Sequence, residues 1–571
     1  MSERLPNHKF HRWFQMADKY EESWRRSNQQ CFEYYDGDQW TREEQEEIEA
    51  RGQQPTVINT IQPTVDMIRS LEVERRADIS VAGRENSDDG KAQLLTELLK
   101  QVFDNCNFDY YHSMAFREAL IGGRGWIECG IQTDERGRDQ VKVDWIPWEN
   151  VRVDPFSRKP DASDAKFIIK QKWLDRDVVK KLFPKSSELI DSVFNETYHG
   201  QEYAAQMDAG DRGIGNYYDT RSQRVRICEC YYTVPEHRMV EVKDEFTGKT
   251  KTKEVFVNAV HFVIFSDEII LQGSAENDSE NKNLLGIDYY PLVPVICMRD
   301  RQGRPRGVVR GLISIQDQIN KLNSKFLWTV ATNRLIAEES AMRDPDEARE
   351  ELQKPDGLVL LNDGGLGKIR VDDKYRDLGY MSNHLNFLLK TEQRISGVND
   401  SMLGLGGENE RSGVMQTTRI NQGAAMQTSI LENLYFSKQR IAQIVLRLIG
   451  KYYTDYRIIR VTQPNGMSDE YQFNIPQIDP ETGKATGILN EISDTLCYDV
   501  VLKKVPPFNT MRERTLMIFS EVLKSGVIPP PVAAKLMLTL SDAPNKEDLI
   551  MELENFYKEQ AAAAAAMPAE Q

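Results

Sequence analysis

No stretch of this 571-residue sequence approaches the roughly 18 consecutive apolar residues that a membrane-spanning helix needs. Near the first residue, no apolar stretch follows the basic residues, so we expect no secretory signal there. Hydrophobic residues make up 40% of the chain, which is typical of a globular rather than a disordered protein. We therefore expect a protein without a membrane anchor that is made and kept in a cytosol.

Cysteine is scarce and does not follow the spacing of a disulfide framework. The seven cysteines are scattered along the chain, and their number is odd. Cys228 and Cys230 form a C-x-C pair, but no second pair or suitable histidine pair lies nearby in sequence to complete a metal site. We expect reduced structural thiols, no metal and no cofactor.

Basic residues are fewer than acidic ones. The chain has 73 Lys and Arg against 89 Asp and Glu, a formal net charge of −16. Proteins that grip nucleic acid usually have a basic surplus, because neutralising phosphates supplies most of the affinity. The balance therefore argues against tight DNA binding over the whole surface, but it is compatible with a surface past which DNA slides.

Catalytic motifs are also missing. The stretch 363–369 resembles a phosphate-binding loop, but Asn362 stands where that loop needs glycine and Ile369 where it needs a Mg²⁺-binding hydroxyl. The sequence has no H-E-x-x-H and no G-x-S-x-G, and its seven histidines are dispersed except for His8 and His11. We therefore expect no enzyme activity.

Residue patterns predict an α+β fold rather than alternating β-α-β units. Helices are predicted at four places near the beginning: 11–34, 41–52, 55–79 and 91–121, the last broken near Asn105. Runs rich in β-branched and aromatic residues predict strands between about 122 and 300, interrupted by one helix near 175–196. Strands are predicted again at 457–462 and 498–502, and three helices over 507–560.

Two apolar stripes at helical spacing occupy the middle of the chain. The first predicts a helix of about 26 residues, about 39 Å long; its stripe is Val308, Leu312, Ile315, Ile319, Leu322 and Phe326. The second stripe is Leu378, Met381, Leu385, Leu388 and Ile395. Between them lies a small charged segment, 334–375, with a strand-like run at 358–361. Such stripes also suit the core of an ordinary monomer.

A glycine-rich loop and a long helix follow. Four glycines within ten residues predict a flexible loop over 400–413. The stretch 414–456 contains no proline and predicts a helix of roughly 40 residues with a kink at Gly423.

Short motifs occur along the chain in a fixed order. They are Tyr35 to Trp40; Gly52, Pro55, Asn59, Ile61 and Pro63; Gly122, Gly123, Gly125 and Trp126; Val153-Asp154-Pro155 with Asp164-Ala165; Lys172-Trp173-Leu174; Gly311, Asp317, Gln318, Asn320 and Ser324; Gly397-Val398-Asn399; and Ser412-Gly413. In their order and spacing over roughly residues 15–560, the chain resembles the portal proteins of tailed double-stranded DNA bacteriophages, especially the podovirus type.

This resemblance implies a homo-oligomeric ring, a dodecamer, at one capsid vertex of the virion. Double-stranded DNA would pass through it during packaging and ejection, after assembly in the host cytoplasm. The implied partners are the terminase large subunit, head–tail adaptor and tail proteins, and capsid and scaffolding proteins. The rival interpretation is another phage head–tail structural or assembly protein without a DNA channel, although adaptors are usually far shorter.

The resemblance also implies a division of the chain. It assigns 1–300 and 457–506 to a wing, 301–333 and 376–399 to two stem helices, 334–375 to a clip, 400–413 to a tunnel loop, 414–456 to a long wing helix, and 507–571 to a crown and short tail. The clip has 11 acidic and 7 basic residues. Its carboxylates would either let DNA pass without sticking or face a positively charged terminase or adaptor.

Charged residues near the first stem helix are candidates for contact with DNA. The arginines are Arg299, Arg301, Arg304, Arg306 and Arg310, and Lys321 and Lys325 lie on the helix itself. Repeated around a ring, the arginines would form a basic girdle that contacts phosphates, or they would pair with acidic groups of neighbouring subunits. The tunnel-loop candidates are Met402, Leu403, Leu405, Glu408, Glu410 and Arg411. These would form a constriction around DNA, or simply a surface connection.

Overall fold

The computed structural model describes most of the chain up to residue 503. The described residues are 5, 8–83, 89–193, 218–219, 222–243, 250–283, 285–331, 335–351, 358–371, 375–403, 420, 422–462, 468–478, 485–489, 492 and 498–503. The chain divides into two units, one of residues 1–70 and 79–502 and one of residues 71–78 and 503–571. The helices predicted over 507–560 lie outside the described residues. Within the described part, no helix is long and apolar enough to cross a membrane.

The N-terminal helices are α1 (Lys9–Asp36), α2 (Arg42–Ala50), α3 (Ile61–Glu74), α4 (Asp89–Asn105) and α5 (Phe108–Gly122). Gly37, with φ of 93°, ends α1, and Thr41 and Glu44 form a capping box that begins α2. The predicted helix 55–79 is wrong at both ends. Asn59 caps the backbone of Ile61, so α3 begins only there, and β1 (Asp78–Gly83) follows it.

Two antiparallel sheets form the body. The smaller has the order β10 (Leu292–Ile296), β2 (Arg124–Thr133), β3 (Asp139–Ile146). The larger contains β4 (Val151–Val153), β5 (Phe167–Asp175), β7 (Arg224–Lys243), β8 (Thr250–Ser266) and β9 (Ile269–Gln272), with the short β6 (Tyr218–Asp219) on β7. This mixture confirms the α+β class. The helix predicted near 175–196 is wrong as one element, because Pro184 follows α6 (Arg176–Leu182) and cannot continue it.

Helix α5 packs closely on β2, and glycine makes this possible. A side chain at Gly125 would meet the backbone of Ala115 in α5. The φ of 107° at Gly123 lies in the region that favours glycine and ends α5. The core around this contact also includes Phe116, Ile127 and residues of α12 (Thr428–Tyr452).

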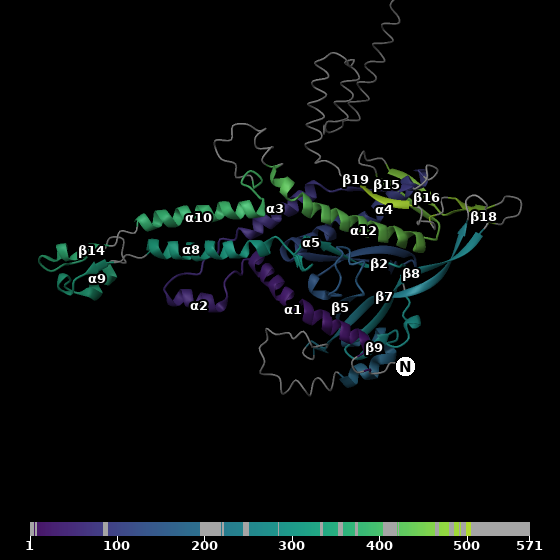
Figure 1. Cartoon of the computed structure of the whole chain (residues 1–571), viewed down its shortest axis with the longest axis horizontal. Coiled ribbons are helices and arrows are strands. Elements are labelled where there is room, and N and C mark those ends of the chain that lie inside the picture. Colours follow the sequence, from purple (N-terminus) through teal and green to yellow (C-terminus); the bar gives the residue numbers. More distant parts are fainter. Residues whose placement is uncertain are drawn as a thin grey trace, which may run out of the picture. The chain divides into compact units, whose positions relative to one another are not determined.

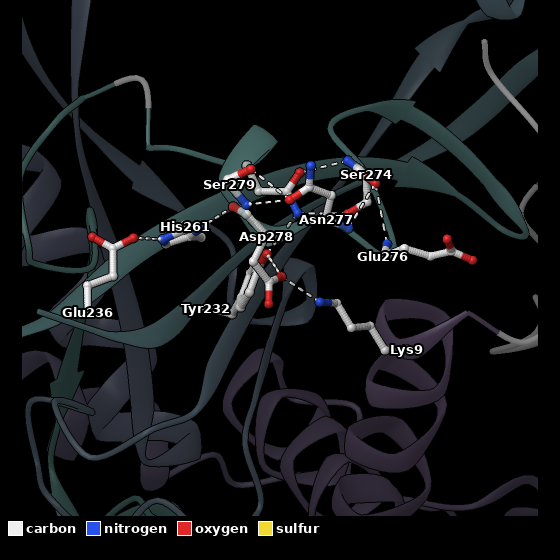
Figure 2. A network of polar contacts seen from close by, with 10 residues as sticks. Lys9, Tyr232, Glu236, His261, Ser274, Glu276, Asn277, Asp278 and Ser279 are labelled. Atoms are coloured by element: carbon white, nitrogen blue, oxygen red, sulfur yellow. Dashed lines mark hydrogen bonds and ion pairs between the residues drawn. The ribbon is translucent and has the colours of Figure 1, made fainter.

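A polar network fastens the start of α1 to the larger sheet (Figure 2). Lys9 Nζ and Tyr232 Oη both donate to Asp278 Oδ1, each over 2.6 Å. The buried ring of His261 hydrogen bonds to the carbonyl oxygen of Asp278 over 2.7 Å and to the Glu236 carboxylate over 2.9 Å. Apolar side chains of α1, including Phe10 and Phe14, pack under the same strands.

The middle of the chain forms two long helices joined by a small module. The short strands β11 (Met298–Arg299) and β12 (Pro305–Arg306) precede α8 (Ile313–Ala331). Between α8 and α10 (Tyr375–Ser396) lie β13 (Leu335–Ala337), α9 (Pro345–Glu351) and β14 (Ile369–Val371), with β13 paired to β14. The strand-like run 358–361 is wrong as a strand, since only Leu361 bridges, to Met342.

The two helices predicted from position 308 and over 414–456 differ from their predicted lengths. The first begins at Ile313 rather than at 308, because residues Val309–Gly311 form a 3₁₀ turn and the Val308 amide donates to Leu120 of α5 over 2.7 Å. The second breaks at Gln427, not at Gly423, and α12 has 25 residues. Gly423 lies within the helical residues before this break, and a side chain there would displace the side chain of Met402.

Three further pairs of antiparallel strands complete the described part. They are β15 (Arg457–Thr462) with β16 (Ser468–Phe473), β17 (Ile475–Ile478) with β18 (Ala485–Leu489), and β1 with β19 (Tyr498–Lys503). The strands predicted at 457–462 and 498–502 are thereby confirmed.

Candidate functional site

Helices α8 and α10 lie side by side (Figure 1), and their facing stripes form a small core. Ile315 and Ile319 of α8 pack against Leu388 of α10. The partly buried residues around them are Leu322, Leu385 and Leu389. The residues of this core belong to the two apolar stripes of the sequence, except for Leu389.

Not every stripe residue joins this core. Val308 and Leu312 pack into the larger core around α5 instead, because α8 has not yet begun at those positions. Ile395 was predicted to pack in the stem, but it is 52% exposed in the single chain. Phe326, Leu378 and Met381 are half-buried and lie outside the small core.

A ladder of buried polar side chains runs along another face of α8. Gln316, Asn320 and Ser324 are each about 1% exposed, and each bonds the extended segment 56–60. The Thr56 amide donates to Ser324 Oγ over 3.1 Å and the Ile58 amide to Asn320 Oδ1 over 3.1 Å. Gln316 Nε2 donates to the Ile58 carbonyl over 2.6 Å.

The ladder follows from the repeat distances of helix and extended chain. Four residues of α-helix rise about 6.0 Å, and two residues of extended chain span about 6.6 Å. Polar residues every four positions on α8 therefore meet alternate residues of segment 56–60. We call this segment, held by Gln316, Asn320 and Ser324, the strap. The Asn320 and Ser324 motif was recognised in the sequence, but its partner was not.

The strap continues into α3, which reaches α10. Thr64 Oγ1 donates to the buried carboxyl group of Glu392 over 3.1 Å. Burial raises the pKa of Glu392, and the hydrogen bond from Thr64 opposes this rise. The strap and α3 thus contact both long helices, so the pair is fixed to the body by polar as well as apolar groups.

The two lysine candidates on α8 differ in their surroundings. Lys321 Nζ forms an ion pair with Glu44 of α2 over 3.0 Å, and this hydrogen bond raises the pKa of the lysine. Lys325 is exposed and has no ion pair with any residue that the structure describes. Within the single chain, Lys321 is therefore already engaged, whereas Lys325 is accessible to another molecule.

The five arginines lie on and after the hairpin of β11 and β12. Asp300 Oδ1 accepts hydrogen bonds from the amides of Gln302 and Arg304, each over 2.9 Å, which closes the turn. Arg299 donates to the backbone carbonyls of Arg158 and Lys159, also over 2.9 Å. Arg299 is thus used to hold the hairpin against the loop after β4.

The other four arginines are more accessible. Arg301, Arg306 and Arg310 are exposed and Arg304 is half-buried. Among the described residues, none of these four has an ion-pair partner. Their guanidinium groups are therefore available for a partner outside the single chain.

Two of the six tunnel-loop candidates fall within the described residues. Met402 is buried near Gly423, and its amide donates to the carbonyl of Asn399 over 3.0 Å. Leu403 packs partly against the core. These two side chains therefore pack against the body rather than pointing into solvent. The other candidates lie outside the described residues: Leu405, Glu408, Glu410 and Arg411.

The described cysteines are free, and all but the half-buried Cys106 are buried. Burial raises the pKa of Cys228 above its ordinary value, so the thiol stays protonated. No group of three or more His, Cys, Asp or Glu residues with metal-binding geometry occurs in the described part of the chain.

Comparison with known proteins identifies the family. Residues 11–571 match the family model of phage P22-like portal proteins, which are structural proteins rather than enzymes. A portal protein of Helicobacter pylori bacteriophage KHP30 is 22% identical over 531 residues, which cover 91% of this chain and 78% of that protein. The chain therefore belongs to the P22-like portal protein family.

Proposed function

We propose that this chain is one subunit of a ring, of about twelve copies as the resemblance implies, that surrounds a DNA channel at one capsid vertex. The observation that carries the proposal is the pair of long helices α8 and α10, joined by a small acidic module and attached to the α+β body through the strap. The genome would be packaged and later ejected through the channel.

The outward faces of the paired helices support assembly with other copies. Trp328 of α8 and Tyr380 and Phe387 of α10 are large and exposed, Tyr380 by 68% and Phe387 by 57%. Aromatic side chains of this size are enriched in protein–protein interfaces. Neighbouring copies in a ring would cover them.

Each part of the chain receives a role in this proposal. The wing would be 1–300, 414–456 and 457–506, the stem α8 and α10, the clip 334–375, and the crown 507–571. The clip would dock the terminase large subunit and then adaptor and tail proteins, and the wing would meet capsid and scaffolding proteins. Assembly would take place in the host cytoplasm, and the finished ring would belong to the virion.

The accessible arginines give the proposed channel a place to contact DNA. Arg301, Arg306 and Arg310 are exposed and lie next to the start of α8. Arginine binds phosphate through two parallel hydrogen bonds, which suits a local grip in an otherwise acidic protein. The tunnel loop would add a second constriction beyond Met402.

Electron microscopy of negatively stained protein tests the ring directly. We expect rings with a central hole, and native mass spectrometry then gives the number of 65.7 kDa subunits. A compact monomer at micromolar concentration would contradict the proposal. Rings without a central hole would instead favour a head–tail assembly protein that has no DNA channel.

A further inference from the structure

A cavity lies beneath the arginine hairpin, on the body rather than on the paired helices. Its walls come from α1, β2, β10, the loop after β4 and the turn of the hairpin. The cavity has a volume of about 60 Å³. Since one water needs about 10 to 15 Å³ by this measure, the space suits a group of roughly four to six water-sized atoms.

Positive charge dominates the wall of this cavity. Four arginines line it: Arg124, Arg158, Arg299 and Arg304. Only two carboxylates line the cavity, those of Glu21 and Asp154, and both already have partners. Glu21 pairs with Arg124 and Arg25, each over 2.9 Å. Asp154 accepts hydrogen bonds from the amides of Phe156 and Lys166, over 3.0 and 2.9 Å.

The cavity-lining arginines therefore have too few anionic partners. Arg158, Arg299 and Arg304 form no ion pair with any described residue. Arg158 and Arg299 donate to backbone carbonyls, which carry no net charge. The pKa of Arg299 is lowered, first by burial and then by repulsion from Arg124, while attraction from Asp164 opposes this. Arg124 is buried and Arg299 and Arg304 are half-buried, so bringing their like charges together is costly unless an anion relieves it, whereas Arg158 is exposed at the edge of the group.

The wall also has more hydrogen-bond donors than acceptors. Arg124 Nε, Arg299 Nε and Trp126 Nε1 have no acceptor in the described part of the chain. Arg124 is also sandwiched between aromatic rings, 4.7 Å from the Trp24 ring centre and 5.3 Å from that of Trp126. Buried donors without acceptors are rare in native proteins and often mark the place of an ion or ligand.

We propose that this cavity binds a small oxyanion, a carboxylate or a phosphate, through Arg158, Arg299 and Arg304. The site is distinct from the proposed contact between exposed arginines and DNA, and it does not depend on a DNA channel. A planar or tetrahedral oxyanion has four or five non-hydrogen atoms, which matches the size of the cavity. Its oxygens would accept from the guanidinium groups, which are suited to such acceptors.

The oxyanion can come from two sources. It can be a free anion such as inorganic phosphate, or the carboxylate of an Asp or Glu side chain from a second copy of this chain. The rim favours neither source over the other, because Tyr20 would border an inserted side chain as readily as a free ion.

Titration of the assembled protein with inorganic phosphate tests the site. Trp24 and Trp126 line the cavity, so their fluorescence reports binding, with sodium chloride at equal ionic strength as the reference. The variant is Arg304→Gln, because this side chain lines the cavity and forms no ion pair on which the fold depends. The matched control is Arg12→Gln, because Arg12 is an exposed arginine of α1 that does not line the cavity.

A free anion predicts a saturable response in wild type and Arg12→Gln that is at least tenfold weaker in Arg304→Gln. A carboxylate from a second copy predicts no saturable response, together with ring dissociation at lower salt in Arg304→Gln than in wild type or Arg12→Gln. Two results would overturn the proposal. In one, Arg304→Gln matches wild type in both measurements; in the other, Arg12→Gln changes as much as Arg304→Gln, which indicates general charge attraction.

Discussion

Asn320 is the central residue of the ladder between α8 and the strap. Its Oδ1 accepts from the Ile58 amide, and its Nδ2 donates to Gln39 Oε1 over 2.7 Å. Asn320→Leu leaves both groups buried without a partner, so we expect a loss of about 2–4 kcal/mol in the free energy of unfolding. Denaturant unfolding measures this loss. Gln318→Ala, on the exposed face of the same helix, should stay within about 0.5 kcal/mol of wild type; equal losses would contradict the role of the ladder.

Glu118 gives stability a dependence on pH. It is buried in α5, where it accepts a hydrogen bond from the Trp148 amide over 3.2 Å, and burial raises its pKa from 4.5 to about 8. The folded state therefore favours the protonated form, and this contribution is lost as pH rises from 4.5 to about 8. Glu118→Gln keeps an acceptor and stays neutral. Its melting temperature should exceed that of wild type at pH 9, with the gap closing towards pH 5.

The exposed Glu135 provides the control for this prediction. It lies in the turn between β2 and β3, where its carboxylate is open to solvent, so Glu135→Gln should follow the wild-type pH dependence. A constant difference between Glu118→Gln and wild type from pH 5 to 9 would show that the carboxyl group of Glu118 does not titrate in this range.

At single positions, the sequence showed which residues belong to motifs, but not what most of them do in the fold. Gly123, Gly125, Asn320 and Ser324 were all recognised as motif residues. The role of Gly123 could have been inferred locally, because a glycine after a helix commonly ends it. The role of Asn320 could not, because its partner Ile58 lies 262 residues away along the chain.

At the level of elements, residues of α10 that pack against α8 can be distinguished from residues of α10 that would contact a neighbouring copy. Leu388 is 5% exposed and touches Ile315 and Ile319, whereas its neighbour Phe387 faces outward. Leu388→Ala should lower the free energy of unfolding by about 2–3 kcal/mol. Phe387→Ala should change it by less than about 0.5 kcal/mol but lower the yield of rings.

Both quantities are measured on the same preparations, by denaturant unfolding at low protein concentration and by the ring fraction in size-exclusion chromatography. If Phe387→Ala assembles like wild type, this face of α10 is not between subunits. If Leu388→Ala unfolds like wild type, the small core between the helices contributes little to stability.

The helix boundaries show why periodicity alone gives the faces of helices better than their ends. The stripe of α8 is continuous from position 308, yet hydrogen bonding of Val308 to Leu120 holds the first turns in another conformation. Likewise, Gln427 interrupts the long helix, where its side chain donates to the last carbonyl of α10, at Ser396, over 2.6 Å. Both effects come from tertiary contacts that the local pattern does not contain.

At the level of the whole molecule, the acidic composition limits where the proposed ring could bind DNA. An acidic chain has no general affinity for DNA, so any grip in the proposed channel must be local. The sequence located a dense arginine cluster but could not divide it. The structure separates Arg299 and Arg304, which line the cavity, from Arg301, Arg306 and Arg310, which are exposed. Only the exposed group is suited to a duplex that passes by.

This division predicts that DNA handling depends on the three exposed arginines together. The triple variant Arg301→Gln, Arg306→Gln and Arg310→Gln should keep the wild-type fold, because none of the three has an ion pair within the described part of the chain. A lower yield of rings would show that these arginines pair with neighbouring subunits instead. Packaged or retained DNA should fall severalfold. For purified rings, the slope of log binding constant against log salt should become shallower by up to about 0.9 for each phosphate that the variant no longer neutralises.

A second triple variant, with Arg136, Arg138 and Lys172 changed to Gln, removes the same charge from other exposed positions on the body. It should leave the salt slope and the retained DNA unchanged, because overall charge acts weakly beyond a Debye length of about 8 Å at physiological salt. If both triple variants lose DNA equally, overall charge governs the interaction. If neither does, the DNA passes without touching this hairpin, and the grip in the proposed channel has to be sought in the tunnel loop.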